Sequence, residues 1–384
     1  MRCGDGHAAR RPSRLLRVAG AVVVATLAWL ACWPAVACPF CDAVAATLRQ
    51  EIAGAEAAVI GVVQGRPAAS DAERLPLRIT RRLKGPAELA PGTMLSVAEA
   101  GGGLAGERVL AVGRGGGPLV WSARPLSRRG EAYLVAVCEA EDEQARLRHC
   151  LRFLGDREPL LADDAYGEFA VAPYAAVRDL AADLDHDQLL RWIEESQTPA
   201  ALRRLSLTLV GVCGDQRDLP MLEEMLKDEA WRREGLDALV ACYLSLAGEA
   251  GLARVEEAFL ANAEATASEV YQVIAAIRFH GTEGRTIPQG ALAQALHPVL
   301  ARADIADLVI ADLARWNDWT QVPRVVELFE ESSSADRLLR VAIVTYLQAC
   351  PLESGRQALL YVEAIDPVSV QRSGRFFAAP PRRE

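Results

Sequence analysis

The feature that most constrains the fold of this chain is a regular succession of apolar segments and short turns in its C-terminal half. The turns lie 34, 33, 36 and 36 residues apart when they are measured from Gly214, Gly248, Gly281, Asn317 and Glu353. A fixed period in this range is typical of an α-solenoid, in which each helix pair buries its apolar face only by stacking on the next. We therefore expect a helical repeat domain over residues 127–365, with repeats visible from Asp187.

The chemistry of these turns favours one class of helical repeat. In Cys213-Gly214-Asp215 and Ala247-Gly248-Glu249, a Gly follows one apolar run and an acidic residue precedes the next. Gly is preferred just after a helix, and acidic residues are favoured where a helix begins. The Trp, Leu-Gly, Tyr and Pro pattern of tetratricopeptide repeats is missing. We expect HEAT-like helix pairs, followed by a flexible, Pro-rich tail over residues 366–384.

Residues 38–126 carry a different pattern. Five short apolar or alternating runs are separated by turns rich in Gly, Pro and Asp: Ala57–Gln64, Leu75–Leu83, Met94–Ala98, Arg108–Val112 and Leu119–Ala123. This spacing predicts a small all-β barrel of the OB-like kind. A helix from Asp42 to Ala53 is expected before the barrel, because Val44, Leu48 and Ile52 recur at four-residue spacing. Pro125 ends the β region, and Ser127 is a candidate N-cap for the first helix after it.

The N-terminus predicts export. Met1–Arg17 is rich in Arg, Val18–Trp33 is apolar, and Ala35-Val36-Ala37 has the form of a cleavage site. We expect residues 1–37 to be a signal peptide and the mature chain to begin at Cys38 in the periplasm or outside the cell. A lipid anchor on Cys38 is not expected, because lipidation signals carry a larger aliphatic residue at the place of Ala35. No later stretch is predicted to span a membrane.

The charge balance narrows the choice of partner. The chain carries a formal charge of −9, and removal of the signal peptide with its five arginines and one aspartate leaves −13. A net-acidic protein repels phosphate backbones, and no basic run offsets this repulsion. Nucleic acid is therefore not an expected partner.

Cys38-Pro39-Phe40-Cys41 is the most suggestive short motif. A Cys-x-x-Cys pair can be redox active when a helix N-terminus lowers the pKa of one thiol. Thioredoxin-like motifs follow a buried strand, however, whereas here a cleavage site precedes Cys38. Asp42 excludes attachment of a c-type haem, which needs His at that place. A structural disulfide in an oxidising compartment is the favoured interpretation, with redox activity or metal binding as alternatives.

The remaining Cys residues favour structural interpretations. His149 and Cys150 would complete a zinc-like set with Cys38 and Cys41, but the separation in sequence makes that set weak. Cys138 and Cys150 are expected to face each other across a helical hairpin, bonded or not. The thiols of Cys213, Cys242 and Cys350 lie on apolar helix faces and are expected in the core. We expect no metal site and no cofactor.

No arrangement of acid–base residues predicts catalysis. The chain lacks His-Glu-x-x-His, a Gly-x-Ser-x-Gly elbow and a phosphate loop. His280 falls in an inter-helix turn, where capping explains it. The acidic cluster of Asp163, Asp164 and Glu168 could serve a hydrolase, but carboxylates are also favoured near helix N-termini. We predict that the protein is not an enzyme.

Trp316 and Trp319 flank one inter-helix turn. Exposed Trp pairs mark binding surfaces, whereas a Trp packed at a junction between repeats is structural. These two residues are the candidate binding residues of the sequence, with packing as the alternative.

Blocks of the chain resemble an uncharacterised family of exported bacterial proteins. The blocks are Cys38–Cys41, Leu83–Pro86, Asp164–Tyr174, Leu209–Gly214, Ile277–Gly281, Asp307–Trp319 and Tyr346–Leu352. The resemblance implies an N-terminal Cys-Pro-Phe-Cys segment, a small β-barrel and C-terminal HEAT-like repeats, and it implies no activity. A shorter likeness, an N-terminal Cys before a barrel with a Leu-Lys-Gly turn, is similar to netrin- and tissue-inhibitor-like barrels and implies a protease inhibitor.

Together these observations predict an exported, non-catalytic binding or scaffold protein. Stacked repeats present a long surface that suits a protein partner better than a small substrate. The alternatives are a netrin- or tissue-inhibitor-like protease inhibitor and a thiol–disulfide protein, both acting through Cys38 and Cys41.

Overall fold

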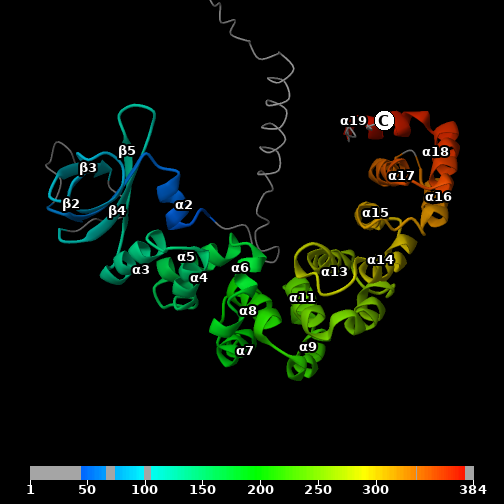
Figure 1. The fold of residues 1–384 in the computed structure, drawn as a ribbon, viewed down its shortest axis with the longest axis horizontal. Helices are drawn as coiled ribbons and strands as arrows, with labels where there is room; N and C mark the ends of the chain where they lie inside the picture. Colours follow the sequence, from blue (N-terminus) through cyan, green and yellow to red (C-terminus); the bar gives the residue numbers. More distant parts are fainter. Residues whose placement is uncertain (1–44, 66–73, 99–104, 334, 377–384) are drawn as a thin grey trace, which may run out of the picture. The chain divides into compact units, whose positions relative to one another are not determined.

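The structure, a computed structural model, describes residues 45–65, 74–98, 105–333 and 335–376 (Figure 1). Cys38, Cys41 and the predicted signal peptide over 1–37 lie outside the described residues. The sheet and the helices belong to one compact unit, Ala37–Glu384.

The predicted β region forms a five-stranded antiparallel sheet. The strands are β1 Ala57–Val63, β2 Arg74–Lys84, β3 Met94–Ala98, β4 Arg108–Arg114 and β5 Val120–Pro125. Their order in the sheet is β3-β2-β1-β4-β5. The sheet curls into a half-barrel (Figure 1), and the edge strands β3 and β5 approach each other. Each strand lies within two residues of its predicted run, because local alternation of side chains sets these elements.

The central strand β1 is buried on both faces, which explains its unbroken apolar run. Val59 joins Leu77 and Trp121 in the core inside the curl. Ile60 points the other way, into the core shared with the helices. A register shift follows Ile60, and there Gly61 is required, because a Cβ atom at this position would lie 2.6 Å from Leu77 Cγ.

The helix predicted from Asp42 is shorter than expected. Helix α2 spans Leu48–Ala53, and residues 45–47 are not helical. Thr47 is its N-cap and forms a capping box with Gln50, in which each side chain binds the backbone N–H of the other residue. The apolar spacing through Leu48 and Ile52 was read correctly, but the cap sets the start.

The chain changes from strands to helices between Pro125 and Ser127, as the sequence predicted. Strand β5 ends at Pro125, and the Ser127 Oγ accepts a hydrogen bond from Gly130 N at 2.8 Å at the start of the first helix after it. Four helices follow: α3 Arg128–Cys138, α4 Glu143–Leu151, α5 Pro159–Ala170 and α6 Tyr174–Arg178. The predicted N-cap is confirmed.

Helices account for most of the chain after α6. They are α7 His186–Glu194, α8 Ala200–Cys213, α9 Leu219–Met225, α10 Glu229–Arg233, α11 Leu236–Ala247, α12 Leu252–Val255, α13 Ala267–Phe279, α14 Gln289–Leu296, α15 Ala306–Arg315, α16 Val322–Glu331, α17 Arg337–Ala349, α18 Glu353–Ile365 and α19 Pro367–Phe376. Helix α8 packs on α11, α11 on α13, α15 on α17, and α17 on α19. The sheet is thus followed by a long series of packed helices.

Two findings differ from the sequence expectations. The tail expected from residue 366 contains α19, which packs on α17. One described helical run, Leu236–Leu260, is long and apolar enough to cross a membrane by length and composition, although no such stretch was expected. Over half of its most apolar window is buried inside the protein, so packing against neighbouring helices accounts for its composition.

Candidate functional site

The two candidate Trp residues do not form an exposed platform. Trp316 is only 8% exposed, and its ring packs on Gly281, where a Cβ atom would lie 2.2 Å from the ring. Trp319 is half-buried, with its ring centroid 5.1 Å from that of Tyr346. The Tyr346 hydroxyl in turn donates to Asp318 O at 2.7 Å. The pair therefore packs the turn between α15 and α16, which is the structural alternative.

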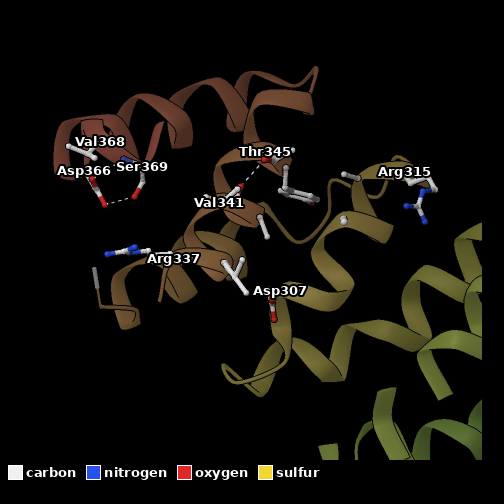
Figure 2. A pocket seen from close by; sticks show the side chains of 13 residues that line it. Asp307, Arg315, Arg337, Val341, Thr345, Asp366, Val368 and Ser369 are labelled. Carbon is white, nitrogen blue, oxygen red and sulfur yellow. Dashed lines mark hydrogen bonds between the residues drawn. The ribbon is translucent and has the colours of Figure 1, made fainter. Parts of the chain in front are cut away.

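A groove lies beside this turn, between α15, α17 and α19 (Figure 2). Its cavity volume is about 1050 Å³. We call it the C-terminal groove, and it is lined by Asp307, Ala311, Ala314, Arg315, Arg337, Leu338, Val341, Ala342, Thr345, Tyr346, Asp366, Val368 and Ser369. Pockets that bind ligands or peptide segments combine an apolar lining with a few polar groups in this way.

The spacing of small residues creates the groove. On α15, Asp307, Ala311 and Ala314 recur at intervals of four and three residues, so they share one face of the helix. On α17, Val341 and Thr345 do the same. Alanine side chains leave space between helices that larger residues would fill, while residues on the opposite faces hold α15 and α17 in the core.

The rim of the groove exposes large apolar side chains. Leu338 is 76% exposed and Val368 is 51% exposed, and both line the cavity. Leu339, next in sequence, is buried in the core. Contiguous apolar surface of this kind is typical of sites that bind another molecule.

Two charged side chains of the groove have no ion-pair or hydrogen-bond partner within the described part of the chain. These are Asp307, in the first turn of α15, and Arg337, in the first turn of α17. Asp366, by contrast, is bound by Arg340 at 2.7 Å and by Ser369, and Arg315 is bound by Asp312 at 2.7 Å. Figure 2 shows Arg337 on the side of Asp366 and Ser369, apart from Asp307 on α15. The groove therefore carries one charge of each sign without a partner in the described ranges.

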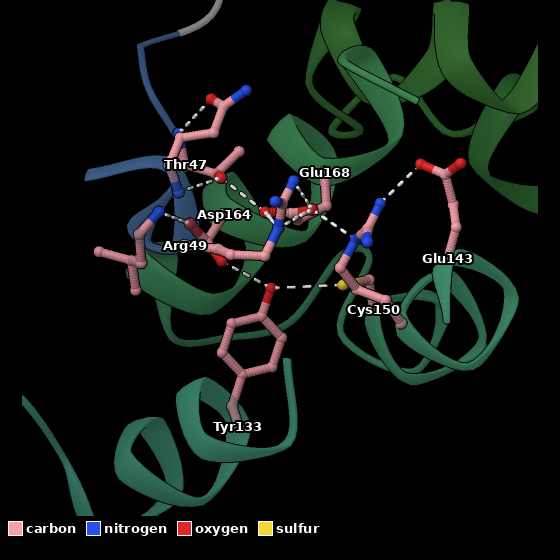
Figure 3. A network of polar contacts seen from close by, with 10 residues as sticks. Thr47, Arg49, Tyr133, Glu143, Cys150, Asp164 and Glu168 are labelled. Carbon is pink, nitrogen blue, oxygen red and sulfur yellow. Dashed lines mark hydrogen bonds and ion pairs between the residues drawn. The ribbon is translucent and has the colours of Figure 1, made fainter. Parts of the chain in front are cut away.

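The predicted acidic cluster lies at a second polar site (Figure 3). Asp164 Oδ1 accepts from Leu48 N at 2.6 Å, and Glu168 Oε1 accepts from the Thr47 hydroxyl at 2.5 Å. Arg49 binds the same Glu168 carboxylate at 3.2 Å. We call these five residues the α2 clasp, because two carboxylates of α5 hold the first turn of α2. Asp163, the third acid of the cluster, is exposed.

Further side chains complete the hydrogen bonding of the clasp. The Tyr133 hydroxyl donates to Asp164 Oδ2 at 2.8 Å and lies 3.6 Å from Cys150 Sγ. Arg146 forms an ion pair with Glu168 at 2.9 Å. Each carboxylate therefore has at least two partners, which buried charges need in order to be stable.

Asp164 and the side chains around it have shifted pKa values and are shielded from solvent. Burial raises the pKa of Asp164, of Tyr133 and of the Cys150 thiol, the last to about 12. Such shifts occur at catalytic sites and also in buried structural networks. Here Glu168 is 0% exposed and Asp164 is buried, so a substrate would have to displace α2 to reach them.

The other sequence candidates are dispersed. Cys138 and Cys150 are free thiols rather than a disulfide, and Cys242 and Cys350 are buried in the helical core as predicted. Cys213 is partly buried against the same core. Within the described ranges, no three His, Cys, Asp or Glu side chains are grouped to hold a metal ion. His149 stacks on Tyr133, with ring centroids 5.5 Å apart.

His280 is the C-cap residue of α13, and its side chain is buried. Its Nε2 lies 3.0 Å from Ala241 O, and its Nδ1 lies 3.4 Å from the Thr286 hydroxyl. Burial lowers its pKa to about 4, so the ring is neutral at neutral pH. His280 therefore joins α13 to α11.

Comparisons of this chain with protein-family profiles, with curated proteins and with solved structures find no match.

Proposed function

We propose that the protein is an exported, non-catalytic binding or scaffold protein that holds a protein partner in the C-terminal groove. The observation that carries this proposal is the 76% exposed Leu338 on the rim of an apolar groove of about 1050 Å³. Leaving such a side chain in water forgoes about 1.5–3 kcal/mol of burial, which a docked protein would recover. The groove replaces Trp316 and Trp319 as the candidate contact surface.

The helical architecture that we propose is an α-solenoid of HEAT-like pairs after an OB-like barrel. Two ion pairs that each join two helices support a repeating unit. Arg204 of α8 binds Asp237 of α11 at 2.8 Å, and Arg278 of α13 binds Asp312 of α15 at 2.8 Å. The partners are 33 and 34 residues apart, close to the period of the turns. Helical repeats of this kind commonly present extended surfaces to proteins.

The protonated thiol of Cys150 and the hydrogen-bonded carboxylates of the clasp favour a non-catalytic role. The raised pKa of Cys150 keeps its thiol protonated at neutral pH, and thiols react as thiolates. The carboxylates of the clasp are occupied by backbone and side-chain donors of α2. These groups act in folding under this proposal.

Export is inferred from the sequence, on the signal-peptide pattern and on the resemblance to exported proteins. N-terminal sequencing of protein recovered outside the cytoplasm should begin at Cys38. A chain that retains Met1 would contradict export, and a lipid adduct on Cys38 would place the protein at a membrane.

The binding role is tested by affinity capture from envelope extract with three baits. Leu338→Asp places a charge on the groove rim, and Val120→Asp changes a side chain of β5 that is equally exposed, at 74%. We expect the wild type and Val120→Asp to retain the same protein and Leu338→Asp to lose it. Retention by all three baits, or by none, would contradict binding at the groove.

A further inference from the structure

We propose that the junction between α13 and α15 is an acid-sensitive hinge, which opens when the imidazole ring of His280 takes up a proton. The inference concerns a movement within the helical region, and it holds whether or not the C-terminal groove binds a protein. It gives a role to the buried polar contacts of His280, which the proposed function does not use.

Helices α13 and α15 are joined differently from their neighbours. Helix α11 packs along α13 and α15 packs along α17, whereas α13 and α15 share almost no close backbone contact. Side chains span the junction instead. Arg278 of α13 donates to Asp312 of α15 at 2.8 Å and to Leu308 O at 2.6 Å. The Trp316 ring lies against Gly281. Segments with little packing are the ones that open locally in a folded protein.

His280 lies next to this contact, at the start of a π-helical turn. The turn spans His280–Gly284 and follows α13 directly. Ala241 O of α11 accepts from the ring Nε2 at 3.0 Å, so Nδ1 carries no proton and accepts from the Thr286 hydroxyl at 3.4 Å. A Cβ atom at Gly284 would lie 2.8 Å from Nδ1, so the turn closes tightly on this edge of the ring. These contacts fit a neutral ring, and single π-helical turns often occur at functional positions.

A proton on Nδ1 places a positive charge in this buried site. The titratable and charged groups beside these contacts come from every surrounding element: Glu283 and Arg285 on the turn, Arg278 on α13, Asp312 on α15, Cys242 on α11, and Tyr174 against Phe279. Arg278 and Asp312 bind each other, and burial raises the pKa of Cys242, so its thiol stays neutral. Burial lowers the pKa of His280 to about 4, and no charged side chain of the described ranges shifts it. A charged ring is therefore stable only where water reaches it.

The direction of the pH effect follows from the two states of the ring. In the closed junction the pKa of His280 is about 4, whereas a ring in water takes up a proton near pH 6.5. Between these values the open state binds more protons, so the ratio of open to closed molecules rises by up to about tenfold for each unit that the pH falls. Movement of the turn displaces Gly281, on which the Trp316 ring packs. Opening therefore frees α15 to move against α13.

The test is hydrogen exchange of the full chain at pH 6.5 and pH 5.0, with protection factors corrected for the intrinsic effect of pH on exchange. We expect protection to fall by about tenfold at the amides of Arg285 and Trp316, which donate to His280 O and Asp312 O in the closed junction. The amides of α8, outside the junction, should keep their protection. An even loss over all helices would mean global unfolding and would overturn the hinge.

His280→Gln is the matched variant. Its side-chain amide can donate to Ala241 O as the ring does, but it takes up no proton, so protection at Arg285 and Trp316 should be the same at both pH values. His186→Gln, at a partly exposed His of α7, should lose protection as the wild type does. Equal pH dependence in His280→Gln and the wild type would refute the role of His280. If circular dichroism shows that His280→Gln does not fold, the wild type decides: a fall confined to the junction supports the hinge, and no fall refutes it.

Discussion

The charged groups of the α2 clasp and those of the C-terminal groove differ in burial and in their partners. In the clasp, the carboxylates of Asp164 and Glu168 are buried and bound by donors on α2 and on neighbouring helices. In the groove, Asp307 and Arg337 have no partner in the described part of the chain, and Leu338, which follows Arg337, is exposed. Satisfied buried charges hold a fold together, whereas unsatisfied charges beside apolar surface are available to another molecule. Under the proposed function, the first region serves folding and the second serves recognition.

Breaking the clasp should have the largest effect on stability. Glu168→Ala leaves Arg49, Arg146 and the Thr47 hydroxyl without their shared acceptor, and we expect a loss of about 3–5 kcal/mol in the free energy of unfolding. Urea denaturation followed by circular dichroism measures this loss. Asp163→Ala, an exposed acid on the same helix, should change stability by less than about 0.5 kcal/mol. Equal effects of the two variants would contradict a structural role for the clasp.

A milder substitution tests the N-cap of α2 while the ion pairs of Glu168 stay in place. Thr47→Val removes the hydroxyl that caps α2 and that donates to Glu168, and it should cost about 1–2 kcal/mol. Hydrogen exchange should quicken at the backbone amides of α2 while those of α5 keep their protection. Unchanged exchange in α2 would show that the cap does not hold this helix.

The pH dependence of stability tests a further buried polar group, His280. The pKa of His280 is lowered to about 4 in the folded protein, whereas an unfolded His takes up a proton near pH 6.5. Between these values the unfolded state binds more protons, so stability is lost as pH falls, by up to about 1.4 kcal/mol per pH unit. The urea midpoint between pH 6.5 and 4.5 should fall less steeply for His280→Gln than for the wild type. Parallel profiles would contradict this contribution.

The smallest effect on stability is expected for a substitution at the rim of the groove. Leu338→Ala should change the free energy of unfolding by less than about 0.5 kcal/mol, because the side chain is exposed in the isolated chain. Leu339→Ala, one position further, removes a buried side chain and should cost about 2–5 kcal/mol. Thermal melts at low protein concentration compare the two. A large loss from Leu338→Ala alone would mean that this residue serves folding rather than binding.

The sequence predicted local features well. The five strands and the Ser127 cap depend on neighbouring residues, and each lies where alternation or capping chemistry placed it. The start of α2 was misplaced, because Thr47 is held there by Glu168, which is 121 residues away in the sequence. The acidic cluster lies inside α5 rather than in its first turn, where the helix dipole was expected to favour it, and its partners on α2 could not be identified from helix spacing.

The candidate binding site was harder to predict. Trp316 is buried because Gly281, 35 residues earlier, leaves room for its ring, and only the packing of the turns shows this. The groove needs α19 as one wall, whereas the composition after residue 366 favoured a flexible tail. The spacing of Asp307, Ala311 and Ala314 was the one local signal, since small residues on one helix face leave space.

The central claim is that Leu338 contacts protein in the cell, and site-specific photo-crosslinking tests it most directly. Benzoylphenylalanine at position 338 should give an adduct of protein mass on irradiation of intact cells, and the same group at position 120 should give none. No protein adduct at position 338, or equal adducts at both positions, would contradict the account.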